Sequence, residues 1–123
     1  MEKISISENF RTFDKYWQSK VVSRLNNQSV KLVKLRGEFD WHHHQSEDEL
    51  YLVLKGKLTL RFRNKTIELN EGEFSVISKG TEHQIIASDE VQLMGIEPQS
   101  TLNSTAEESK PDPAASTAAK GGK

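Results

Sequence analysis

The chain has 123 residues, a formal net charge of −1, no cysteine and a hydrophobic content of 34%. This length suits one domain and not two. No block of basic residues stands out, so neither nucleic-acid binding nor binding to an anionic membrane surface is predicted. The absence of cysteine excludes disulfides, thiolate metal sites and cysteine nucleophiles.

A cytoplasmic location is expected from the charged residues near the N-terminus and from the short length of the apolar runs. The first fifteen residues include Glu2, Lys3, Glu8, Arg11 and Asp14, which does not resemble a signal peptide. No apolar run approaches the roughly 20 residues that a membrane-spanning helix needs. We therefore expect a protein without membrane segments.

The C-terminal stretch differs in composition from the rest of the chain. Between Ser100 and Lys123 the only large apolar residue is Leu102. Such a segment cannot bury enough surface to offset the entropy that it would lose on folding. We predict a disordered tail over residues 100–123, which leaves residues 1–99 as the folded domain.

A short helix is predicted near residues 7–15. Ser5 and Glu8 fit a capping box, in which the two residues satisfy exposed helix N–H groups. Ile6, Phe10, Phe13 and Trp17 follow at helical spacing. This pattern indicates one amphipathic helix that lies against a sheet.

From residue 20 to about residue 97 the chain has the pattern of short strands separated by turns. Several segments alternate apolar with polar residues, and no proline occurs before Pro98. Many short strands at this spacing are typical of a β-sandwich or barrel. The predicted strands are Lys20–Leu25, Ser29–Arg36, Glu38–His44, Glu49–Lys55, Lys57–Arg63, Thr66–Leu69, Phe74–Ser78, Thr81–Ala87 and Val91–Ile96.

The run from Leu50 to Leu54 is apolar at every position. A strand that is covered on one side only should alternate with polar residues. Either a second layer or a partner subunit must therefore cover its other face. We expect a homodimer.

Three of the four histidines of the chain enter one candidate metal site. If residues 38–44 form a strand, His42 and His44 point to one face and His43 to the other. Glu49 follows the next turn, and His83 comes from elsewhere in the barrel. Three imidazoles and a carboxylate can hold a divalent metal. The alternative is that the histidine run is a polar rim and that His83 is an unrelated surface residue, and spacing alone leaves both open.

Two segments resemble the two motifs of the cupin superfamily. Residues Gly37–Gly56 are similar to the first motif, and residues Gly72–His83 to the second, with Ser78 where that motif has proline. The chain resembles small single-domain cupins of the mannose-6-phosphate isomerase-like type. The resemblance implies an all-β double-stranded β-helix, or jelly-roll barrel, with a metal in its mouth. By motif position it implies the metal ligands His42, His44, Glu49 and His83.

The donor set suits Fe, Mn, Ni, Co, Cu or Zn, and the sequence does not choose among them. The first hypothesis is a metal-dependent enzyme that acts on a small polar molecule, either a sugar-type isomerase or a dioxygenase. The alternative is a non-catalytic module that binds a small molecule or a metal. A third hypothesis is a structural protein in which the metal only stabilises the barrel. No catalytic residue is predicted. Asp40 and Tyr51 are each two residues from a proposed ligand, so on a strand they would point to the same face as that ligand. An acid or base beside the metal would favour the enzyme.

Overall fold

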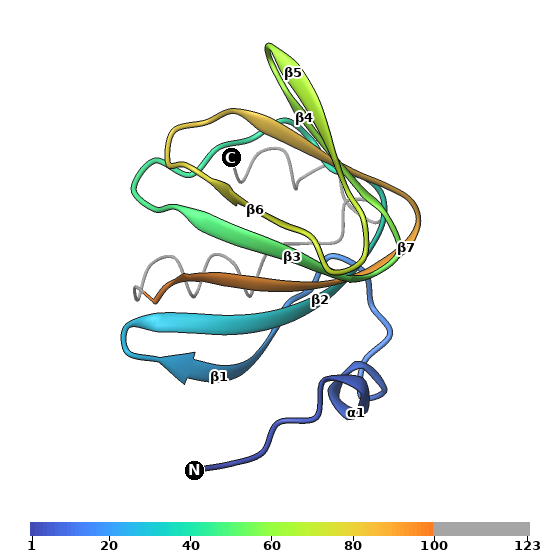
Figure 1. Cartoon of the computed structure of the whole chain (residues 1–123), viewed down its shortest axis with the longest axis vertical. Coiled ribbons are helices and arrows are strands. Elements are labelled where there is room, and N and C mark those ends of the chain that lie inside the picture. Colours follow the sequence, from blue (N-terminus) through green and yellow to red (C-terminus); the bar gives the residue numbers. More distant parts are fainter. Residues whose placement is uncertain (100–123) are drawn as a thin grey trace.

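Seven antiparallel strands and one short helix make up residues 1–99, which are the residues that the computed structural model describes (Figure 1). The predicted disordered tail, residues 100–123, lies outside them. The predicted all-β class with one N-terminal helix is confirmed. The elements are α1 (Ile6–Phe10), β1 (Lys20–Leu25), β2 (Gln28–Glu38), β3 (Glu49–Lys55), β4 (Leu58–Phe62), β5 (Lys65–Leu69), β6 (Phe74–Ile77) and β7 (His83–Pro98).

The Ser5 half of the predicted capping box is present, because the Ser5 side chain accepts a hydrogen bond from the Glu8 backbone N–H at 3.2 Å, whereas the Glu8 carboxylate contacts Arg11. The predicted C-terminal end near residue 15 is wrong, since the helix ends at Phe10. Beyond it, the Phe13 carbonyl accepts a hydrogen bond from the Lys34 ammonium. The last turn is closed by tighter i to i−3 hydrogen bonds, from the Arg11 N–H to the Glu8 carbonyl at 3.1 Å and from the Thr12 N–H to the Asn9 carbonyl at 3.0 Å.

Five strands form one sheet in the order β1-β2-β7-β3-β6, and β4 joins it through β7 while pairing with β5 on its other side (Figure 1). All strand pairs are antiparallel. The strand β7 therefore connects the larger sheet to the β4–β5 hairpin. Between them lies the core, formed by Trp17, Leu35, Phe39, Val53, Leu58, Leu60, Leu69, Ile77, Ile85, Ala87, Val91 and Leu93.

The segments predicted as Thr81–Ala87 and Val91–Ile96 are one strand, so their separation was wrong. β7 runs without a break from His83 to Pro98 and pairs first with β4 and then with β2 and β3. The polar residues 88–90 sit where the register against β2 shifts. A β-bulge takes up these extra residues without ending the strand, and alternation along one sequence does not reveal such a bulge.

The predicted strand Glu38–His44 is also wrong. β2 ends at Glu38, and residues 39–48 form a loop that meets β7 at a few points only. Phe39 donates a backbone hydrogen bond to Ile85, and His42 donates one to His83, each at 2.9 Å. Three residues of the loop therefore span the same length as two residues of β7. The side chains of the loop do not alternate strictly, as the predicted strand required.

Within residues 1–99, no helix has the length and apolar character that a membrane crossing requires. The cytoplasmic location stays a prediction.

Candidate metal centre

His42 and His83 are held against each other by the backbone. Each donates its N–H to the carbonyl of the other at 2.9 Å, and their ring centres lie 4.3 Å apart. Both are buried, with 4% and 0% of their surface exposed. The loop after β2 and the start of β7 therefore fix two imidazoles side by side in the interior.

A second pair of hydrogen bonds defines which nitrogen of each ring faces the site. The Nδ1 atom of His42 lies 2.9 Å from the Asp40 carbonyl oxygen, and the Nδ1 atom of His83 lies 2.9 Å from the Thr81 carbonyl oxygen. A carbonyl can only accept, so Nδ1 is the donor in both rings. In the neutral imidazole the lone pair is then on Nε2, as in metal-binding histidines whose other nitrogen is held by the protein.

His44 and Glu49 complete the cluster. The Nε2 atom of His44 lies 3.2 Å from Oε1 of Glu49, and the Tyr51 hydroxyl donates to the same oxygen at 2.7 Å. The His44 ring centre is 5.4 Å from that of His42 and 6.3 Å from that of His83. Imidazoles that share one tetrahedral ion at about 2.0–2.1 Å have ring centres roughly 5 Å apart. The two distances from His42 are near this value, whereas the distance between His44 and His83 is longer.

The structure therefore brings the four predicted ligands side by side. His43 is half-buried, and the ring contacts that join the other three histidines in residues 1–99 do not include it. As placed, however, no three His, Asp or Glu side chains among the described residues form a group that could hold a metal ion. Binding would require side-chain adjustment, and the ligand set stays a prediction.

The electrostatic surroundings of Glu49 favour its charged form. Burial acts to raise the pKa of this carboxyl, but hydrogen bonds with His44, Glu97 and Tyr51 and the charge on His44 outweigh burial and hold the pKa well below its usual value. Glu49 is therefore a carboxylate at neutral pH. This is the form in which it can bind a cation.

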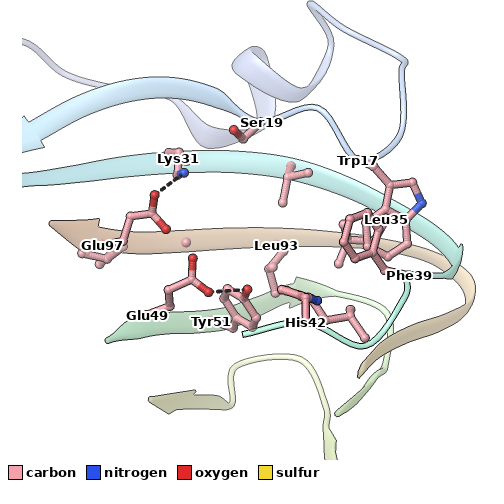
Figure 2. A pocket seen from close by; sticks show the side chains of 14 residues that line it. Trp17, Ser19, Lys31, Leu35, Phe39, His42, Glu49, Tyr51, Leu93 and Glu97 are labelled. Carbon is pink, nitrogen blue, oxygen red and sulfur yellow. Dashed lines mark hydrogen bonds and ion pairs between the residues drawn. The ribbon is translucent and has the colours of Figure 1, made fainter. Parts of the chain in front are cut away.

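A buried ion pair lies next to Glu49. The Lys31 ammonium is 2.7 Å from Oε2 of Glu97, and 8% and 7% of the two side chains are exposed (Figure 2). In the register of β2 against β7, Lys31 is opposite Gly95 and Ser29 is opposite Glu97. Lys31 and Glu97 are thus diagonal neighbours on the inner face of the sheet. The pairing of the two strands brings their charges together.

A small cavity of about 80 Å³ opens beside these residues. Figure 2 shows Lys31, Glu97 and Glu49 at one end of it and Trp17, Leu35 and Phe39 at the other. Trp17 has a φ of 67°, its indole N–H donates to the Arg36 carbonyl at 2.9 Å, and its ring stacks on Phe39. The cavity is therefore polar near Glu49 and aromatic near Phe39, whose ring centre lies 5.1 Å from that of His42.

Sequence reasoning missed three residues of this cavity, which are Ser19, Lys31 and Glu97. Lys31 has the same parity as Val33 and Leu35, and Glu97 has the same parity as Leu93. A charged residue at a position of the alternating pattern that otherwise faces the core could have identified Lys31 and Glu97 as buried. Of the two residues singled out for their parity, Tyr51 contacts Glu49 through its hydroxyl, whereas Asp40 supplies its backbone carbonyl to His42.

Comparison with known proteins agrees with this architecture. A solved structure of a cupin-2 domain containing protein from Shewanella frigidimarina NCIMB 400 has a TM-score of 0.77 and 41% identity, and the match covers 78% of this chain and 94% of that one. A Neisseria meningitidis protein has a TM-score of 0.74 and 26% identity over 80% of this chain and all of that one. These matches confirm the jelly-roll fold.

The sequence comparisons concern a shorter part of the chain. The uncharacterized protein YdbB of Bacillus subtilis (strain 168) is 42% identical over 64 residues, which is 51% of this chain and 57% of the length of YdbB. The mannose-6-phosphate isomerase-like subtype stays a prediction. The profile of the cupin domain family matches residues 30–96, which is more than half of the chain, and the chain therefore belongs to the cupin domain family.

Proposed function

We propose that this protein is a metal-dependent cupin in which His42, His44, Glu49 and His83 bind one divalent transition metal. The main observation in support is that the His42 and His83 rings are oriented in the same way, since the Nδ1 atom of each is hydrogen-bonded to a backbone carbonyl at 2.9 Å. Two imidazoles whose Nδ1 atoms donate to backbone carbonyls can bind a cation through Nε2, and together with a carboxylate they form a borderline nitrogen and oxygen donor set. Fe, Mn, Ni, Co, Cu and Zn are the candidate ions.

We further propose that the metal serves an enzyme that acts on a small polar molecule. When bound, such an ion would supply Lewis acidity toward a ligand oxygen. The cavity next to the cluster is lined by Tyr51 and Glu97, which are groups able to hold or move a proton, rather than by apolar side chains alone. This supports the enzyme over the non-catalytic binding module. A substrate screen on metal-loaded protein would separate a sugar-type isomerase from a dioxygenase.

Elemental analysis of purified, untagged protein tests the metal site. We expect about one transition metal per wild-type chain after loading and dialysis, and a loss of at least about tenfold in His42→Ala and in His83→Ala. His43→Ala is the matched control, because it removes an imidazole from the same run while leaving the cluster intact. Equal metal content in all four proteins, whether high or low, would contradict the proposal.

The outer face of the sheet offers a place for a second copy of this chain. Its strand pairings align two rows of apolar side chains across four strands. The β6 end of the rows is open, with Phe74 and Val76 exposed by 59% and 52%. The two rows are Val76, Leu50, Ile96, Val30 and Phe74, Leu52, Met94, Leu32, of which Leu32 is already fully buried within the chain.

We propose that this face forms a symmetric homodimer. Neither row contains a charged residue, so the face can pack against itself without repulsion, and a two-fold axis requires only such self-complementarity. Phe74→Lys should convert a dimer into a monomer in size-exclusion chromatography with light scattering. Leu25→Lys, at a site that is 61% exposed on β1, is the control. A monomeric wild type would refute the proposal.

A further inference from the structure

One wall of the cavity combines a hydroxyl with a buried ion pair. Ser19 and Lys31 both line the cavity, and Ser19 lies above Lys31 in Figure 2. The Oγ atom of Ser19 is buried and has no hydrogen-bond partner within residues 1–99. Buried hydroxyls are almost always hydrogen-bonded in folded proteins. The wall therefore presents a polar atom that a ligand in the cavity can satisfy.

The formal charges around the cavity favour an anion once the proposed metal is bound. Among residues 1–99, Lys31 is the only lysine or arginine that lines the cavity, and Glu49 and Glu97 are the only carboxyls. A divalent ion and Lys31 together carry more positive charge than two carboxylates can cancel, whether or not Glu97 keeps a proton. Uncompensated buried charge is costly. A ligand with one negative charge would offset it.

The size of the cavity limits the ligand. One water needs roughly 10–15 Å³ on this measure. A cavity of about 80 Å³ therefore has room for only a handful of heavy atoms. Gly95 contributes to this space, because it faces Lys31 on β2 and Tyr51 on β3 without a side chain between them. A built Cβ at Gly95 would meet only the Leu50 carbonyl oxygen, at 3.9 Å.

We propose that the ligand class of this site is a small monocarboxylate with a neighbouring oxygen atom. Its carboxylate would accept hydrogen bonds from the Ser19 hydroxyl and the Lys31 ammonium, and its other oxygen would face the histidine cluster. Charge-assisted hydrogen bonds of this kind are the strong ones. This inference rests on the proposed metal site, and it assigns Ser19 and Lys31 as the residues that select the anion.

The test uses glycolate and glycolamide, which have the same number of heavy atoms but differ in charge. Calorimetric titration of the metal-loaded wild type should give an affinity for glycolate at least about tenfold higher than for glycolamide. Ser19→Ala should weaken glycolate binding by about tenfold, because a hydrogen bond to the charged group is lost. Ser23→Ala, on the exposed part of β1, is the matched control and should bind as the wild type does.

A second variant separates the role of Lys31 from that of the metal. Lys31→Met/Glu97→Gln removes the ion pair without changing the net charge, and it should reduce the preference for glycolate over glycolamide to within about threefold. Thermal unfolding and metal analysis of each variant would establish that it is folded and loaded. Gly95→Val should block both ligands by filling the cavity.

Two results would overturn the inference. The first is unchanged glycolate affinity in Ser19→Ala, and the second is a full glycolate preference in a folded, metal-loaded Lys31→Met/Glu97→Gln. Either result in a chain that holds metal refutes the ligand class and leaves the metal site standing. A wild-type chain that binds no metal refutes the proposed function, and this inference with it.

Discussion

Replacing Lys31 with methionine is expected to lower the free energy of unfolding by about 3–5 kcal/mol. The Lys31 ammonium lies 2.7 Å from the Glu97 carboxylate, and both side chains are more than nine-tenths buried. The substitution leaves a carboxylate in the interior beside Glu49 without its cation. Urea-induced unfolding followed by tryptophan fluorescence would measure the change.

Two comparisons show whether burial is the cause. Lys57→Met removes an ion pair with Glu68 in which the atoms are 3.7 Å apart and both side chains are 58% exposed, so it should cost less than about 1 kcal/mol. Lys31→Met/Glu97→Gln removes both charges and should recover most of the loss. A Lys31→Met protein as stable as Lys57→Met would show that Glu97 does not need its partner.

Gly56→Ala is expected to destabilise the fold by about 2–4 kcal/mol, from backbone strain and steric overlap together. Gly56 has a φ of +93°, a region that L side chains rarely adopt. A Cβ here would also lie 2.6 Å from the Glu90 carbonyl oxygen. That oxygen belongs to the backbone of β7, so it cannot move aside as the end of a long side chain would.

Gly37→Ala is the matched control, because Gly37 has a similar φ of +97° and no atom lies within 4 Å of its built Cβ. It should cost only the strain, about 1–2 kcal/mol. The difference between the two variants in thermal or urea unfolding then measures the overlap with Glu90. Equal losses of stability in the two variants would mean that the β7 backbone moves away from the new Cβ and that the overlap with Glu90 has no cost.

The sequence predicted best those strands that adjoin clear turns. The bounds of Lys20–Leu25 and Glu49–Lys55 are as expected, because Asn26 and Asn27 follow the first strand, and Gly56 follows the second. The prediction failed at Glu38–His44, where a loop meets β7 at isolated points, and at residues 88–90, where a bulge inserts residues without ending the strand. Only the partner strand shows where the register shifts.

The candidate site was predicted in part, and partly for the wrong reason. His42 and His44 were placed together by the parity of a strand that does not exist, yet the loop that replaces it brings both rings beside His83. The cupin motifs pointed to the same residues without that assumption. Lys31 and Glu97 were missed because they are 66 residues apart and meet only through the register of β2 on β7.

The continuity of β7 restricts how the length of this chain can change during evolution. His83 lies at its first position and Glu97 near its last, and both point inward. Deleting or inserting a single residue within the paired segments would turn one of the two outward, because neighbouring strand residues face opposite sides. Homologues that keep both groups inside should therefore gain or lose residues in this interval at the bulge around residues 88–90, where an unpaired residue leaves the alternation on either side unchanged.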